Sequence, residues 1–262
     1  MVTEPDVDSG AFYGADLAYI HHVGFGDFAA AAAGEFASLL TRAGITSGQV
    51  LDLGCGTGIL ARELTTLGYD VMGVDGSADM LALAAATAPR ATFVQGNIQE
   101  MSLPRCRAVF AIGEALAYLP PHARRPPSLR STFARVARAL EPGGLFVLDL
   151  IATGGGSPMA YRSWQAGDGW AVLVDVREDR SARIVHRQIT AFRSNGSGYR
   201  RTDERHAVAV YARSDVEGWL GAAGLRARVQ RHYGRVALPP RRLGFVARRE
   251  QASSRPAEGR VR

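Results

Sequence analysis

The segment VLDLGCGTG, residues 50–58, decides the fold of this 262-residue chain. Its first half is a short apolar run, which is typical of a parallel strand buried on both faces. Gly54, Gly56 and Gly58 then let the backbone turn tightly and approach a ligand, because glycine has no Cβ to block the approach. The helix predicted after the turn, ending near Leu67, directs its free N–H groups toward whatever the turn holds.

This turn differs from one that binds a dinucleotide. The dinucleotide pattern, Gly-x-Gly-x-x-Gly, would require glycine at position 59, where this chain has Ile59. Asp52 also stands two residues before the first glycine, where dinucleotide folds usually carry an apolar side chain. Both differences disfavour NAD as the ligand, so a NAD-dependent oxidoreductase is kept only as an alternative.

Strands and helices alternate along the chain on both sides of this segment. Apolar runs predict strands at 50–53, 70–75, 91–94, 107–112 and 145–150. Helical spacing predicts helices at 57–67 and 77–87, the second capped by Ser77, and a third that carries Phe133 and Val136. Such alternation gives a parallel sheet with helices on both faces, and the predicted fold is therefore a doubly wound α/β fold.

Several motifs resemble those of a known enzyme family. Residues 52–58 resemble Asp/Glu-x-Gly-x-Gly-x-Gly, the first motif of the class I S-adenosylmethionine-dependent methyltransferases, and the likeness is to the subgroup that acts on small molecules. Asp75 follows Gly54 at about the ~20-residue spacing of a ribose-binding acid. Segments that resemble the family's second strand, third-strand turn and turn before strand five are residues 71–75, 96–98 and 140–145. The matches keep the family's order, which makes them stronger evidence than one glycine-rich turn.

The resemblance implies that the chain binds S-adenosylmethionine and releases S-adenosylhomocysteine. Asp52 is expected to bind the amino group of the methionine part, and Asp75 the ribose hydroxyls. Asn97 is expected to meet the adenine amino group, with Ile98 and Met80 packed on the ring; an ordinary turn asparagine is the alternative. The residues predicted to bind the cofactor are Tyr13, Asp52, Gly54, Cys55, Gly56, Gly58, Asp75, Gly76, Met80, Asn97, Ile98, Ile112, Gly113 and Tyr118.

Methyl transfer from a sulfonium depends chiefly on alignment, because the donor is already activated. Positioning alone can supply ~7–11 kcal/mol. A base is needed only if the acceptor must lose a proton. By the resemblance Glu114, just past the fourth strand, is predicted to face the transferring methyl, and His21 and His22 are the predicted imidazole bases. The other histidines are expected to be packed or solvent-facing: His122, His186, His206 and His232.

The first 44 residues are predicted to cover the cofactor, as the N-terminal segment often does in this family. A helix is expected from about Asp27, a suitable N-cap, to Arg42. An aromatic and imidazole cluster precedes it, from which Tyr13, Tyr19, His21 or His22 would reach the pocket. The alternative is that these side chains only staple the helix to the surface.

After residue 152 the pattern changes to period two, which predicts an antiparallel insert over residues 152–212. The alternating runs are residues 171–177, 183–193 and 200–211, and Asn195-Gly196 predicts a hairpin turn between the last two. The insert is expected to roof a closed acceptor pocket.

The remainder of the chain is expected to complete a seven-stranded, mostly parallel sheet around the core of residues 45–151. Ser214 and Glu217 predict a capping box for one more helix. Strands at 226–232 and 243–248 close the segment 213–249, and residues 250–262 are predicted to be a disordered tail.

Composition narrows the class of partner. All 31 basic residues are arginine, and eleven of them lie after residue 225, so the preceding part is net acidic although the whole chain is +6. This distribution argues against a nucleic-acid partner. Two cysteines provide neither a disulfide framework nor a metal site, and no apolar run reaches the ~20 residues of a membrane span. With no signal peptide apparent, we expect a cytoplasmic protein, monomeric or homodimeric, with no membrane association.

The leading hypothesis is a methyltransferase that moves a methyl group to nitrogen or oxygen of a small metabolite. A nucleic-acid base methyltransferase is an alternative, disfavoured because residues 112–116 lack the Asn/Asp-Pro-Pro-aromatic motif and extrusion of a base needs a basic channel. A non-catalytic relative that binds S-adenosylmethionine is a further alternative.

Overall fold

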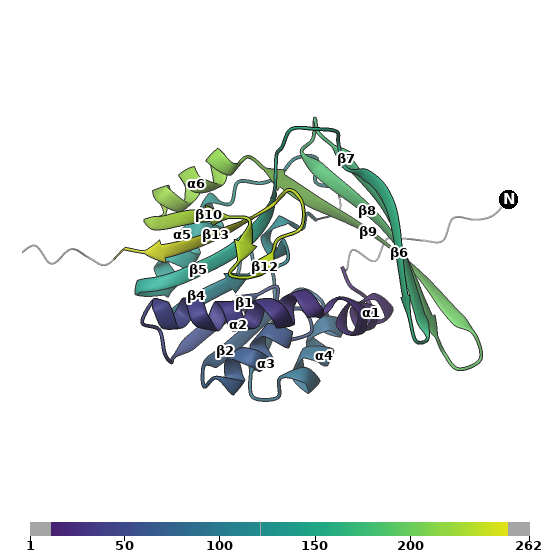
Figure 1. The fold of residues 1–262 in the computed structure, drawn as a ribbon, viewed down its shortest axis with the longest axis horizontal. Coiled ribbons are helices and arrows are strands. Elements are labelled where there is room, and N and C mark those ends of the chain that lie inside the picture. The colour runs from purple at the N-terminus through teal and green to yellow at the C-terminus, as the bar shows by residue number, and fades with distance from the viewer. Residues whose placement is uncertain (1–11, 121, 251–262) are drawn as a thin grey trace, which may run out of the picture.

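The computed structural model describes residues 12–120 and 122–250, and a mixed sheet forms its centre (Figure 1). The core strands are β1 (Gln49–Leu53), β2 (Asp70–Asp75), β3 (Thr92–Gln95), β4 (Cys106–Ala111), β5 (Leu140–Ala152), β10 (Leu225–Gln230) and β13 (Arg242–Arg249). They lie in the order β3-β2-β1-β4-β5-β13-β10, with β13 antiparallel to both of its neighbours. This confirms the predicted doubly wound, seven-stranded, mostly parallel sheet.

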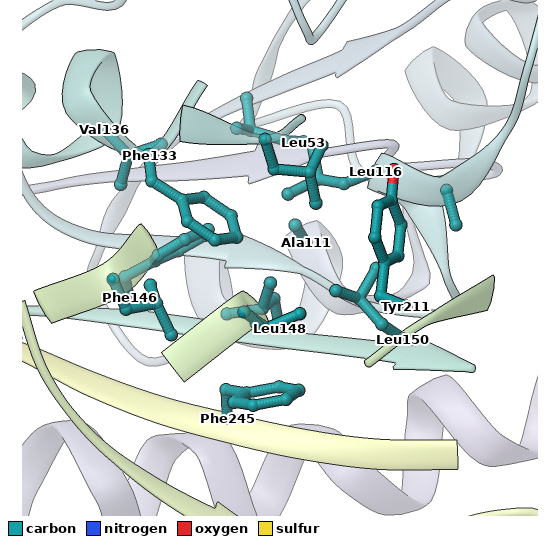
Figure 2. Packing of buried hydrophobic residues seen from close by; sticks show 14 of the residues in the cluster. Leu53, Ala111, Leu116, Phe133, Val136, Phe146, Leu148, Leu150, Tyr211 and Phe245 are labelled. Carbon is teal, nitrogen blue, oxygen red and sulfur yellow. The ribbon is translucent and has the colours of Figure 1, made fainter. Parts of the chain in front are cut away.

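Helices cover both faces of the sheet. They are α2 (Asp27–Arg42), α3 (Ile59–Thr66), α4 (Ala78–Thr87), α5 (Arg130–Ala139) and α6 (Arg213–Ala222). On one face α2 and α3 bury Phe36 and Leu64 against strand residues such as Phe110. On the other, α5 brings Phe133 against Phe146, as Figure 2 shows. Burial of each such side chain contributes roughly 1.5–3 kcal/mol, so this packing holds the strand ends in place.

The insert consists of four antiparallel strands, one more than predicted: β6 (Ala160–Gly167), β7 (Trp170–Asp179), β8 (Ile184–Ser194) and β9 (Tyr199–Tyr211). Every residue of β6 is exposed, so the strand has no alternation of buried and exposed positions for a sequence pattern to detect. The predicted hairpin at Asn195-Gly196 is confirmed, since Ser194 pairs with Tyr199 across it. Residues 151–152 of β5 pair with β9, so the insert continues the core sheet (Figure 1).

A helix that was not predicted, α1 (Ala15–Phe25), lies between α4 and the insert (Figure 1). Leu17 and Ile20 of α1 pack against Trp170 and Ile189 on the inner face of the insert. Helix α2 was predicted, but its N-cap is Gly26, and Asp27 is the first helical residue. Helix α1 therefore joins helix α4 of the core to the insert.

One predicted helix cap is confirmed and another is wrong. The hydroxyl of Ser77 accepts the N–H of Met80, 3.1 Å away, and so caps α4 as expected. Helix α6 begins at Arg213 with Ala212 at the N-cap, so Ser214 lies inside the helix and forms no capping box. Glu217 instead pairs with Arg213, one turn earlier on the same helix face.

The expected boundaries at 44, 151 and 212 remain predictions, and most of the predicted tail, residues 251–262, lies outside the described residues. Within residues 12–120 and 122–250, no single helix is long and apolar enough to cross a membrane.

Candidate active site

The glycine turn after β1 has the backbone that its sequence suggested. Gly54, Gly56 and Gly58 all have positive φ, at 76°, 51° and 76°. A Cβ on Gly54 would lie 2.4 Å from the Cβ of Ala115, so a side chain there is excluded. At Gly56 a Cβ would meet no atom within 4 Å, which leaves space beside the backbone for a ligand.

Asp75, at the end of β2, accepts hydrogen bonds from the glycine turn and from the residue that caps α4. One carboxylate oxygen accepts the N–H of Gly56 at 2.9 Å, and the other accepts the N–H of Ser77 at 2.9 Å. Burial raises the pKa of Asp75, while these hydrogen bonds oppose the rise. The carboxylate thus links the glycine turn to the start of α4.

Asp52 is the least satisfied polar side chain at the turn. It is 3% exposed, and its Oδ2 has no hydrogen-bond partner among the described residues. Burial, and then the nearby charge of Asp75, raises the pKa of Asp52 to about 7. A buried carboxyl with an unused oxygen suits a cationic ligand group. Asp52 is also close enough to Asp75, which accepts the N–H of Gly56, for the two charges to interact. These features fit the amino group and methionine part of S-adenosylmethionine.

The other predicted cofactor residues surround the same turn. Ile98 lies near Gly54, since its Cδ1 would be 3.9 Å from a Cβ there, and Met80 is buried at the start of α4. Asn97 is exposed, and its Oδ1 accepts the N–H of Gln99 at 2.9 Å, so in this structure its side chain stabilises its own turn. Cys55 lies within the glycine turn, and Gly76 directly follows β2. Ile112 packs instead with the buried cluster of α2 and α3 that includes Phe36 and Leu64.

Helix α1 brings both predicted imidazoles to the site. His22 Nδ1 lies 2.9 Å from the hydroxyl of Thr57 in the glycine turn. His21 is mostly buried, and burial followed by the proximity of His22 lowers its pKa to about 4. His21 is therefore neutral at neutral pH and holds a proton weakly.

Tyr13 and Tyr118 meet across the site. Their hydroxyl oxygens are 2.7 Å apart, and burial raises the pKa of both, so both hydroxyls are protonated at neutral pH. The carbonyl of Tyr13 accepts the hydroxyl hydrogen of Ser77. This contact joins the N-terminal segment to the glycine turn, Asp75 and Ser77, which together are called the cofactor edge. The structure thus brings both predicted tyrosines together.

Glu114 is placed differently from its predicted role. It is 2% exposed, and its two carboxylate oxygens are bound by the guanidinium groups of Arg187, at 2.7 Å, and of Arg242. A carboxylate held by two guanidiniums is poorly suited to take a proton, so the expectation that it faces the transferring methyl is not supported. Its backbone N–H and that of Gly113 donate to Asp149, whose pKa burial raises to about 6.

The residues that bind Glu114 and Tyr13 were not predicted from the sequence. Arg187 and Arg242 come from β8 and β13, far along the chain from Glu114. Glu204 and His206 of β9 approach Tyr13 from the insert. The sequence marks them only weakly. They are polar residues on a strand face whose other positions are largely apolar.

Known proteins similar to this chain are methyltransferases. Residues 50–144 match a family model described as a methyltransferase domain. The dTDP-3-amino-3,4,6-trideoxy-alpha-D-glucopyranose N,N-dimethyltransferase of Streptomyces venezuelae is 30% identical, and the match covers 81% of this chain and 90% of that protein. The dTDP-3-amino-3,6-dideoxy-alpha-D-glucopyranose N,N-dimethyltransferase of Streptomyces fradiae is 28% identical, covering 80% and 83%. The crystal structure of Streptomyces venezuelae DesVI is 26% identical, with a TM-score of 0.74 over 92% of this chain and 100% of that chain.

Proposed function

Because this chain belongs to the S-adenosylmethionine-dependent methyltransferases, we propose that it methylates the amino group of a nucleotide-linked amino sugar. That it is an enzyme acting at nitrogen or oxygen of a small molecule, with S-adenosylmethionine as cofactor, follows from its relatives. The choice of nitrogen and of a sugar acceptor is the proposed part.

The extent of the likeness supports this choice of acceptor. The family model ends at residue 144, before the insert. The likeness to the two sugar N,N-dimethyltransferases covers 80–81% of this chain and therefore extends into the insert. The inner face of the insert lies opposite the cofactor edge, where an acceptor must bind to meet the methyl group. The proposal is carried by one observation: the similarity to the two sugar N,N-dimethyltransferases extends beyond the cofactor-binding core into the insert.

We assign the cofactor as the sequence motifs suggest. Asp52 would bind the amino group, and Asp75 the ribose hydroxyls, exchanging its present backbone partners in part for the ligand. Asn97 would contact the adenine, with Ile98 and Met80 against the ring. The bound cofactor supplies an electrophilic methyl carbon, whose bond to sulfur breaks as the bond to nitrogen forms. The protein's part is to align the two groups and to exclude water.

The cellular setting stays a prediction. We infer a cytoplasmic enzyme, monomeric or homodimeric, and we expect no nucleic-acid substrate. The net acidic composition of the first 225 residues supports the last point, because a polymer substrate would need a basic channel.

A matched pair of acceptors tests the proposal. Purified full-length protein is incubated with S-adenosylmethionine and either a dTDP-linked 3-amino sugar or the same compound with hydroxyl at that carbon. Mass spectrometry is expected to show methyl groups added to the amine alone, and Asp75→Ala should lose most of this activity. Methylation of the hydroxyl compound alone, or of neither, would contradict the proposal.

A further inference from the structure

His206 of β9 lies on the face of the insert that contacts the N-terminal segment, packed among the rings of Phe12, Tyr13 and Tyr118. It is 2% exposed, and its ring lies 4.9 Å from that of Tyr13 and 5.6 Å from that of Tyr118, centroid to centroid. Tyr13 is bound through its carbonyl to Ser77, whose N–H donates to Asp75. His206 is therefore connected, through Tyr13 and Ser77, to the carboxylate of Asp75.

Glu204 determines which nitrogen of this imidazole carries the proton. His206 Nε2 lies 2.7 Å from Oε2 of Glu204, which also accepts the N–H of Tyr13 at 2.8 Å. The other oxygen, Oε1, accepts the N–H of Gly14 at 2.9 Å. An oxygen that already accepts a backbone N–H acts as an acceptor in this contact, so the hydrogen between the two groups belongs to Nε2. In the neutral imidazole with its hydrogen on Nε2, Nδ1 carries a lone pair.

This Nδ1 has no hydrogen-bond partner among residues 12–120 and 122–250, although it is buried. Buried polar atoms are nearly always paired, so an unpaired acceptor in this position indicates a partner supplied by a ligand. A carboxylate on one imidazole nitrogen and a free lone pair on the other is the arrangement of a general base.

We propose that His206, oriented by Glu204, accepts the proton that the acceptor amine must lose before methylation. The step rests on the proposed N-methylation. An N–H bond of the ammonium breaks, its electron pair stays on nitrogen, and the proton binds Nδ1. The imidazolium that forms is stabilised by the Glu204 carboxylate, and the free amine then attacks the methyl carbon.

Neighbouring groups are less suited to this step. His21 also has an unpaired buried Nδ1, but its ring lies against those of Tyr13 and Phe25, with no carboxylate partner among the described residues. Burial, and then the nearby His22, lowers its pKa to about 4. Both oxygens of Glu114 are bound by guanidiniums. Among these three groups, His206 alone combines a free lone pair with a charge that stabilises its protonated form.

The surrounding charges agree with this role. The titratable and charged groups that face His206 are Glu204, Arg187, Tyr13 and Tyr118. Arg187 is its register partner on β8 and would oppose protonation, but the guanidinium is directed to Glu114, 2.7 Å away. The raised pKa of each tyrosine keeps both hydroxyls neutral. Among residues 12–120 and 122–250, Glu204 is therefore the one uncompensated charge in contact with the imidazole.

Replacement of the imidazole tests the proposal by kinetics. His206→Gln keeps an N–H able to reach Glu204 but has no basic nitrogen. We expect kcat/KM for the amino sugar at pH 7 to fall ~100-fold or more, while affinity for S-adenosylhomocysteine changes less than ~2-fold. The loss should shrink as pH rises, because the amine then loses its proton in solution. His186→Gln, on an exposed histidine of β8, is the matched control and should change neither value.

An unchanged rate and pH profile in His206→Gln, with an active wild type, would overturn the proposal. If that variant fails to fold, His206→Asn gives the same kinetic decision. A wild type that methylates no amine would instead count against the proposed function. Nitrogen NMR of the labelled wild type bound to S-adenosylhomocysteine then still decides about the base, since we expect a proton on Nε2 of His206 at neutral pH. A proton on Nδ1 would overturn the proposal.

Discussion

Asp52 and Asp75 are neighbouring carboxyls with different surroundings. Asp75 is satisfied by two backbone donors, whereas one oxygen of Asp52 has none within the described part of the chain. A buried carboxyl in this condition is costly to ionise, and its pKa of about 7 reflects that cost. At the scale of single residues, the site is therefore incomplete until a cation binds beside Asp52.

We expect S-adenosylhomocysteine to release a proton from Asp52 when it binds at pH 6. With a pKa of about 7, the carboxyl is mostly protonated in the free protein, and the ligand's ammonium group favours the carboxylate and lowers that pKa. Calorimetry in buffers of different ionisation enthalpy counts the protons released. Asp52→Asn has no proton to lose there and serves as the control. Proton uptake by the wild type would contradict the assignment.

Asp75→Ala is expected to weaken binding of S-adenosylhomocysteine by roughly 1.5–3 kcal/mol, the usual worth of hydrogen bonds to a charged group. The loss has two sources, the ribose contacts and the link between Gly56 and Ser77. Asp79→Ala, on an exposed carboxylate in the first turn of α4, is the control and should bind normally. Equal affinities of Asp75→Ala and the wild type, measured by titration calorimetry, would show that the ribose assignment is wrong.

At the scale of elements, helix α1 depends on the insert for its position. The carboxylate of Asp16, 3% exposed, is paired with Arg193, at 3.4 Å, and with Arg200. The guanidinium of Arg193 also lies 3.8 Å over the ring of Tyr19. These contacts join α1 to both strands of the β8–β9 hairpin, and α1 in turn carries His22 to the glycine turn.

We expect Asp16→Asn to loosen α1 without unfolding the core. The two arginines would lose their buried partner, so amide hydrogens of residues 15–25 should exchange several-fold faster, while those of β1 and β4 stay protected. Hydrogen exchange followed by mass spectrometry measures this. Asp27→Asn, an exposed position at the start of α2, is the control. Uniform loss of protection across the chain would indicate global destabilisation instead.

The Glu114 cluster joins core strands to the insert and should matter for stability. Glu114→Gln leaves Arg187 and Arg242 without their shared carboxylate, and breaking a buried pair in this way typically costs ~3–5 kcal/mol. Glu217→Gln, which breaks a surface pair with Arg213, should cost less than ~1 kcal/mol. Denaturant unfolding compares the two. Similar stability of Glu114→Gln and Glu217→Gln would contradict the structural role of Glu114.

At the scale of the whole molecule, elements with a local periodic signal were predictable. The core strands and helices α2 to α5 were found to within a few residues because each has apolar residues at its own period. Helix α1 was missed because it buries residues on several sides, against α4 and the insert, and so has no single apolar face. Strand β6 was missed because no residue of it is buried. Helix α1 is positioned by contacts with distant parts of the chain, whereas β6 is held by pairing with β7, the next strand.

The site shows the same division. The glycine turn, Asp52 and Asp75 are encoded within one strand–turn–helix unit and its neighbour, so a sequence pattern could identify them. The ion pairs of Glu114 and the contact of Glu204 with Tyr13 depend on the register between strands that are far apart in the chain. Spacing along the sequence carries no information on that register, and Glu114 was therefore assigned a role that its partners do not support.

Strand β5 is shared by the core and the insert, because its middle pairs with β4 and β13 and its last two residues pair with β9. The last two residues of β5 thus hydrogen-bond the insert directly to the strand that carries Asp149. Under the proposed function, a change of inward side chains on β7 or β8 would alter the acceptor side, while the glycine turn and Asp75, which lie on other strands, would keep their places.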